Sequence, residues 1–195
     1  MMFTAERLKY VDEYYFSKKM REINNYISSG RPIINMALGS PDLSPSLEVK
    51  QALSESIGDH RSSMYQSYNG LLELREAISN FYYKQYSVEI NPTDEILPLM
   101  GSKEGIMHIS MAFLNKGDRV LIPNPGYPTY RAVSKLLGAE VLNYNLSEEN
   151  NWYPKIDDLE SLNPKNIKLM WINYPHMPTG ADFDEKKLNE LIFWA

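Results

Sequence analysis

The clearest periodic segment of the chain lies between Leu71 and Tyr86. Its apolar side chains recur at intervals of three and four residues, the spacing of one face of an α-helix. Upstream of this helix, the pattern predicts a helical N-terminal arm over about 5–29, followed by a short apolar strand over 33–38. It also predicts a helix that begins after a cap at Ser46 and runs to about residue 57.

Beyond residue 94, short apolar runs alternate with longer amphipathic ones. The short runs predict strands over 95–100, 119–123, 140–146 and 167–173. The longer runs predict helices over 104–115, 128–137, 156–162 and 184–194, and Gly117 and Gly138 follow two of them, as helix ends favour. This alternation predicts an α/β fold, in which a largely parallel sheet is covered by helices on both faces and binds ligands at the carboxyl ends of its strands.

The last predicted helix reaches Ala195 without a stop signal, and no strand follows it. A parallel sheet that ended there would leave apolar surface and a strand edge uncovered. We therefore expect more chain downstream.

Composition and charge narrow the classes of partner. The chain has 195 residues, 43% of them hydrophobic, which suffices for a sizeable core. Its net charge of -5 shows no long single-sign run, so neither nucleic acid nor an anionic membrane is expected as a partner. The charged N-terminus does not resemble a signal peptide, and no apolar run approaches the ~20 residues of a membrane helix, so we expect a cytoplasmic protein that binds small molecules.

Metal and thiol chemistry are not expected. The chain has no cysteine, which excludes disulfides and thiolate metal sites. The three histidines, His60, His108 and His176, lack the spacing of metal ligands.

The turn Gly101-Ser102-Lys103-Glu104-Gly105 lies where a predicted strand gives way to a helix. Backbone N–H groups at a helix N-terminus, a hydroxyl and an ammonium form a good cradle for a phosphate group. Taken alone, the turn also fits an ordinary helix cap with a solvent-facing lysine. It lacks the P-loop spacing, and the chain lacks the dinucleotide fingerprint, which disfavours an NTP or NAD site.

Three further loops carry aromatic and polar residues. Prolines stiffen the segment 123–130, so Tyr127 could form a flat wall against a planar ring; alternatively, Tyr127 and Tyr130 pack the top of the sheet. The other two are 172–180, after a predicted strand, and 64–70, before the predicted helix that contains Leu-Arg-Glu-Ala-Ile.

Together these segments resemble the class I/II aminotransferases of the fold-type I enzymes, which use pyridoxal 5′-phosphate (PLP). The family's Gly-x-Pro-Asp stands at 39–42, and its tyrosine, glycine and Leu-Arg-x-Ala-Ile stand at Tyr65, Gly70 and 74–78. Its Gly-Ser-Lys-Glu turn, its Pro-x-Pro-x-Tyr-Pro-x-Tyr segment and an altered Pro-x-Asn-Pro-Thr-Gly segment follow in order. The likeness covers nearly the whole chain.

The resemblance implies a fold and a domain division. The fold is the three-layer sandwich of an aspartate aminotransferase-like large domain, incomplete here. Residues 1–44 would form the N-terminal arm and a small-domain segment. Residues 45–195 would form the first part of the PLP-binding large domain, truncated at its C-terminus.

The resemblance also implies roles for single residues. The turn 101–103 would hold the PLP phosphate, and Tyr127 would stack on the pyridine ring. Tyr65 would reach the phosphate of the neighbouring subunit's cofactor across a homodimer, and the backbone of Gly39 would lie beside the substrate carboxylate. Met177 stands where the family has an asparagine that donates to the ring hydroxyl oxygen, and a thioether cannot donate. His176 could supply a donor instead, although packing or solvent exposure is the simpler role for it.

The family's Schiff-base lysine lies in a Ser-x-x-Lys setting that these 195 residues lack. Lys186 and Lys187 follow the Pro-Thr-Gly loop, but their pattern indicates a solvated helix face. We therefore expect the lysine after Ala195, together with the acid that pairs with the pyridine nitrogen and the arginine that clamps the substrate. No catalytic residue is expected within this chain, which alone would be inactive.

The leading hypothesis is the N-terminal half of a PLP-dependent aminotransferase, which moves an amino group between an amino acid and a 2-oxo acid. Another fold-type I enzyme, such as a C–S lyase or a decarboxylase, would share the same cofactor residues. A non-catalytic PLP-binding or dimerisation module is the third alternative. The residues do not specify the substrate side chain.

Overall fold

The computed structural model describes residues 3–195. These fall into two units: one holds the described residues up to Asp12 together with Leu99–Ala195, and the other is Glu13–Pro98. The predicted domain boundary at residue 44 lies inside the second unit and stays a prediction. Across the described residues, no helix is long and apolar enough to cross a membrane.

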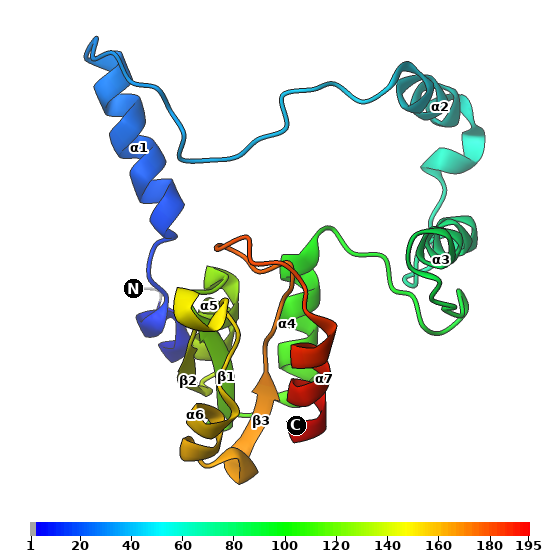
Figure 1. Cartoon of the computed structure of the whole chain (residues 1–195). Helices are drawn as coiled ribbons and strands as arrows, with labels where there is room; N and C mark the ends of the chain where they lie inside the picture. The colour runs from blue at the N-terminus through cyan, green and yellow to red at the C-terminus, as the bar shows by residue number, and fades with distance from the viewer. Residues whose placement is uncertain (1–2) are drawn as a thin grey trace. The chain divides into compact units, whose positions relative to one another are not determined.

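The unit Glu13–Pro98 is helical. Ser46 caps its second helix as predicted, because the Ser46 hydroxyl accepts a hydrogen bond from the Val49 N–H at 3.4 Å. The longest helix confirms the periodic segment of the sequence. In chain order the helices are α1 (Tyr15–Ser28), α2 (Leu47–Gly58), the 3-10 turn η2 (His60–Ser63) and α3 (Leu72–Tyr86), all labelled or traceable by colour in Figure 1.

Arg75 ties α3 to the turn that follows it. Its guanidinium is buried and donates to the carbonyl oxygens of Pro92 and Thr93, the latter at 3.0 Å. One turn further along the same helix, the Ser79 hydroxyl donates to the Ile90 carbonyl at 2.6 Å. The segment after α3 is therefore held by side chains rather than by strand pairing.

The other unit contains a parallel sheet. Its strands are β1 (Arg119–Asn124), β2 (Glu140–Asn145) and β3 (Ile167–Met170), in the order β2-β1-β3. Its helices are α4 (Ser102–Phe113), α5 (Pro128–Leu136), α6 (Ile156–Ser161) and α7 (Glu185–Trp194), with 3-10 turns η1 (Glu6–Tyr10), η3 (Glu148–Asn150) and η4 (Pro164–Asn166). Gly138 directly follows the C-cap of α5 and adopts the positive φ expected of a helix end. Gly117 also has a positive φ, but it lies in the turn before β1, because α4 ends at Phe113.

The central strand shows why this is a layered α/β structure. Successive side chains of β1 point to opposite faces of the sheet. Val120 and Ile122 pack with residues of α4 and α5, whereas Leu121 packs with Leu159 of α6 and Leu191 of α7. Helices therefore cover both faces, which confirms the predicted fold class.

Two predicted strands are wrong. Residues 33–38 form no strand, and Ile34 and Met36 are 89% and 88% exposed. Residues 95–100 also lack strand structure, and the Glu95 carboxylate accepts from the Asn91 N–H instead. Both segments contain the apolar residues on which the prediction rested, but no described strand lies beside either of them. Because a strand needs a neighbouring strand for its backbone hydrogen bonds, neither segment forms one.

Two other predicted elements differ in length. The N-terminal helix expected over 5–29 is divided into η1 and α1, with residues 11–14 between them outside any helix. β3 ends at Met170 rather than at residue 173, although the Trp171 N–H still donates to the Leu121 carbonyl at 3.0 Å. Pro175 lacks an N–H group, so the ladder cannot extend far into this segment.

Candidate cofactor site at the carboxyl ends of the strands

Three segments of the predicted site lie at the same end of the sheet. The N-terminus of α4, the loop from β1 to α5 and the loop after β3 all lie at the carboxyl ends of the parallel strands (Figure 1). β1 is hydrogen-bonded to both β2 and β3, so it is the central strand of the three. Ligands of open α/β sheets bind at this end.

The first segment is the turn that opens α4. The helix begins at Ser102, two residues earlier than predicted, so Ser102 and Lys103 occupy its first turn and are exposed. Gly101 precedes them with φ 107° and ψ 162°, a conformation that side chains with a Cβ rarely adopt. The N–H groups of a first turn have no intrahelical partners, and the helix dipole is positive there. The turn is therefore suited to an anion.

Sequence reasoning missed how this turn is held. The Glu104 carboxylate accepts the Met100 N–H at 2.6 Å, and its other oxygen lies 3.4 Å from Nε2 of His108. The bond from Met100 is the main reason that the pKa of Glu104 is lowered. The available signal was a glutamate at the third helical position, where such side chains reach back to the preceding backbone.

The second segment carries Tyr127, which directly precedes α5. Its partly buried ring meets Tyr130 edge-on, with centroids 5.7 Å apart and planes at 83°. Tyr130 is buried and stacks on Trp171 at 5.0 Å and 10°. Tyr130 thus packs the top of the sheet, and Tyr127 leans on it.

The third segment contains His176 and Met177. His176 is only 3% exposed, and its Nδ1 lies 2.8 Å from the Thr179 hydroxyl oxygen. Its backbone N–H donates to the Ala181 carbonyl, and its carbonyl accepts the Gly180 N–H, both at 2.7 Å. His176 therefore packs inside its own loop, and burial lowers its pKa. Met177, beside it, is 49% exposed and offers no donor.

Tyr153 is a support of this loop that the sequence did not indicate. Its ring stacks on Tyr174, and its hydroxyl accepts the Asp184 N–H at 2.7 Å. Lys187 contradicts the prediction of a solvated face: its Nζ lies 5.0 Å from the Tyr153 ring centroid and donates to the Asn150 carbonyl at 3.3 Å. Its long apolar stem explains the error, because lysine can cover a ring while its charge stays near water.

Tyr65 and Gly39 belong to the unit Glu13–Pro98. Tyr65 is fully exposed and lines a cavity of about 670 Å³ within that unit, together with Arg61 and Gln66. Gly39 is exposed, and a Cβ on it would meet no atom within 4 Å. The cofactor role of Tyr65 and the substrate role of Gly39 stay predictions.

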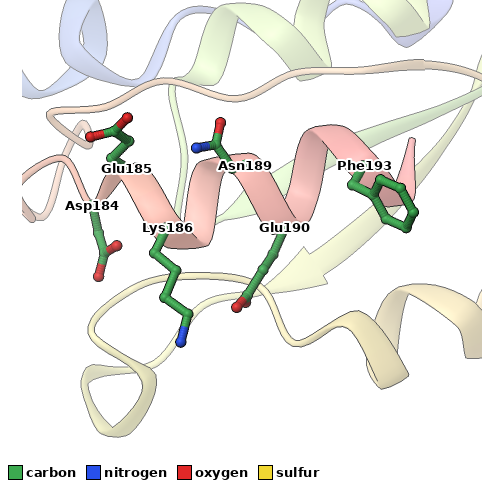
Figure 2. A pocket seen from close by; sticks show the side chains of 6 residues that line it. All are labelled: Asp184, Glu185, Lys186, Asn189, Glu190 and Phe193. Carbon is green, nitrogen blue, oxygen red and sulfur yellow. The ribbon is translucent and has the colours of Figure 1, made fainter.

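A cavity beside α7 shares no residue with these segments. It is an open hollow of about 790 Å³ on the outer side of α7, and Figure 2 shows its side chains. Three carboxylates and one ammonium line it, a balance that disfavours a phosphate group. No group of three or more potential metal ligands occurs in the described part of the chain. The lining residues are Asp184, Glu185, Lys186, Asn189, Glu190 and Phe193.

Comparison with known proteins agrees with this geometry. An LL-diaminopimelate aminotransferase of Aquifex aeolicus is 35% identical over 191 residues, which are 98% of this chain and 49% of that protein. The apo structure of BacF from Bacillus subtilis superposes with a TM-score of 0.92 at 32% identity, covering 100% of this chain and 50% of that one. An aspartate aminotransferase of Rhizobium meliloti superposes with a TM-score of 0.90, covering 100% of this chain and 48% of that one. At 23% identity, this likeness shows the fold alone.

The chain spans about half the length of the curated relatives it matches. The model of the family described as aminotransferase class I and II matches residues 31–194. Members of this family depend on PLP. The chain belongs to the aminotransferase class I and II family.

Proposed function

We propose that this chain is part of a PLP-dependent aminotransferase, which moves an amino group between an amino acid and a 2-oxo acid. In this proposal the chain supplies the residues that contact the phosphate and the ring of the cofactor. The observation that carries the proposal is the first turn of α4, which presents Ser102 and Lys103 at the carboxyl end of the sheet. Family membership supplies the reaction class. When bound, PLP supplies an electron sink for the bonds at the substrate Cα.

The turn fits a phosphate group in charge and in hydrogen bonding. A phosphate monoester carries a charge of about -1.5 to -2 at neutral pH and offers strong acceptor oxygens. Ser102 can donate from its hydroxyl and from its backbone N–H, and Lys103 brings an ammonium. The positive φ of Gly101 lets the backbone enter the helix here. Gly101, Ser102 and Lys103 would therefore hold and orient the cofactor through its phosphate.

The ring contacts fit in part. Tyr127 would face the pyridine ring, with Tyr130 fixing its tilt. Met177 cannot donate to the ring hydroxyl oxygen, and His176 is buried in the hydrogen bonding of its own loop. Position 177 would therefore contribute contact area but no hydrogen bond.

We further propose that the lysine which holds the cofactor covalently and moves the proton at Cα lies outside these 195 residues. Lys186 is exposed on α7, and Lys187 is engaged by Tyr153 and Asn150. In the assembled protein, Tyr65 would reach the cofactor phosphate of the other subunit of a homodimer, and Gly39 would lie beside the substrate carboxylate. We also propose a cytoplasmic location.

Product analysis of the full-length protein tests the reaction. The donor is LL-diaminopimelate, after which one of the similar proteins is named, and the acceptor is 2-oxoglutarate. We expect one glutamate for each new 2-oxo acid, and no turnover when 2-oxoglutarate is left out. Release of carbon dioxide, or cleavage of a sulfur-containing amino acid, without a 2-oxo acid would instead establish a decarboxylase or a C–S lyase and overturn the proposal.

A further inference from the structure

We propose that Glu104 is a positioning residue for the phosphate turn: its carboxylate holds the Met100 N–H and so fixes the backbone that presents Ser102 and Lys103. The inference rests on the proposed function, because it presumes that this turn binds the PLP phosphate. It assigns a positioning role to Glu104, the last residue of the Gly-Ser-Lys-Glu motif, without requiring that Glu104 contact the cofactor.

Two hydrogen bonds of Glu104 close the turn. Oε2 accepts the Met100 N–H at 2.6 Å, and the Glu104 backbone N–H donates to the Gly101 carbonyl at 3.2 Å. Glu104 is therefore hydrogen-bonded to both Met100 and Gly101, the two residues that precede α4. Gly101 cannot fix itself, because it has no side chain and lies at φ 107°.

A packing contact beside these bonds holds the same turn. A Cβ on Gly105 would lie 2.7 Å from Cδ1 of Leu99, so the glycine permits close approach of the Leu99 side chain. The residues on either side of the turn are thus held by Glu104 and by this contact. Between them, the side chains of Ser102 and Lys103 are exposed.

Electrostatics alone would argue against a carboxylate in this place. A negative charge in the first turn of α4 repels a phosphate bound at that turn. Charge and positioning therefore predict opposite effects when Glu104 is replaced. If charge dominates, loss of the carboxylate strengthens phosphate binding, whereas if positioning dominates, loss of the acceptor weakens it.

Two substitutions separate these effects. Glu104→Ala removes both the charge and the acceptor for the Met100 N–H. Glu104→Gln removes the charge and keeps an amide oxygen that can accept. Glu185→Ala is the matched control, because Glu185 lies in the first turn of α7, in the same unit, and lines the cavity of Figure 2.

Equilibrium titration with PLP near neutral pH gives the main readout, and pyridoxal, which lacks the phosphate, is the comparison ligand. We expect Glu104→Ala to weaken PLP binding on the order of tenfold, the effect of losing a helix-cap hydrogen bond. Glu104→Gln should stay within about threefold of the unsubstituted protein, the range of a weaker neutral hydrogen bond. Glu185→Ala should leave the affinity unchanged, and pyridoxal binding should not respond to Glu104.

Amide hydrogen exchange at Met100 gives a second readout that needs no cofactor. Exchange should accelerate in Glu104→Ala and remain slow in Glu104→Gln. The inference is overturned if PLP binds Glu104→Ala as tightly as the unsubstituted protein, or if the two substitutions weaken binding equally. Absence of saturable PLP binding by the unsubstituted protein would overturn the proposed function and this inference with it.

Discussion

The rings of Tyr153 and Tyr174 stack with their centroids 4.2 Å apart and their planes 6° from parallel. Tyr153 follows η3, whereas Tyr174 lies in the loop after β3 that carries His176 and Met177. The Tyr174 hydroxyl donates to the Trp152 carbonyl at 2.8 Å and adds a second tie between the same segments. The loop after β3 is thus supported by residues that precede α6.

Removal of the Tyr153 ring should destabilise the protein strongly. Tyr153 is 3% exposed, so Tyr153→Ala should lower the free energy of unfolding by about 3–5 kcal/mol, the usual cost of deleting a buried aromatic ring. Tyr153→Phe keeps the stack and loses the hydroxyl contacts, so it should cost about 1 kcal/mol. Urea denaturation measures both. Equal losses in the two variants would show that the hydroxyl, rather than the stack, is decisive.

His176 should make stability depend on pH. Burial lowers its pKa in the folded state, so the unfolded chain takes up the proton first as the pH falls. The contribution of neutral His176 is therefore fully present above its unfolded pKa of about 6.5 and is lost as the pH falls below that value. We expect the difference in unfolding free energy between the unsubstituted protein and His176→Phe to shrink on acidification. A difference independent of pH would contradict this, and His60→Gln, at an exposed histidine, is the control.

Met177→Asn should strengthen PLP binding. An asparagine amide can donate to the ring hydroxyl oxygen, and one such hydrogen bond is worth roughly threefold to tenfold in affinity. Met177→Leu keeps a similar volume without a donor and should leave the affinity unchanged. The same titration with PLP compares the two. Equal affinities for the Asn and Leu variants would show that position 177 does not face the ring oxygen.

Arg75→Met should loosen the segment after α3. The substitution keeps the apolar stem but leaves the Pro92 and Thr93 carbonyls without their donor. We expect a loss of about 2–3 kcal/mol in unfolding free energy, the scale of hydrogen bonds from a charged group. Arg75→Lys keeps the charge but loses the planar guanidinium, so its unfolding free energy should lie between those of the unsubstituted protein and Arg75→Met. A neutral effect of Arg75→Met would assign the stability of this segment to other contacts.

The sequence predicted those parts of the fold that local patterns encode. The spacing of apolar residues at three and four predicts α3, and the alternation of short apolar runs with longer amphipathic runs predicts the three strands of the sheet. Gly138 follows the end of α5 at the predicted place. The failures at 33–38 and 95–100 have one cause: a short apolar run does not reveal whether another strand lies beside it. Strand pairing is a property of distant segments.

The same limit applies to the candidate site. The position of Tyr127 was predictable because it follows a strand that the structure contains, β1. The strand expected before Ser102 and Lys103 is absent, and these two residues are placed by the start of α4 instead. Tyr153 was not predictable, since its role depends on a contact with a loop far along the chain. Lys187 was misjudged because a charged helix face usually faces water, whereas here the apolar stem lies near an aromatic ring.

The central claim is that the first turn of α4 binds the cofactor phosphate, and a PLP titration of the double variant Ser102→Ala/Lys103→Ala tests it most directly. Loss of a hydroxyl donor and of an ammonium should weaken PLP binding on the order of a hundredfold. Lys186→Ala, at an exposed lysine of α7, is the matched control and should bind as the unsubstituted protein does. Unchanged PLP affinity in the double variant would contradict the claim.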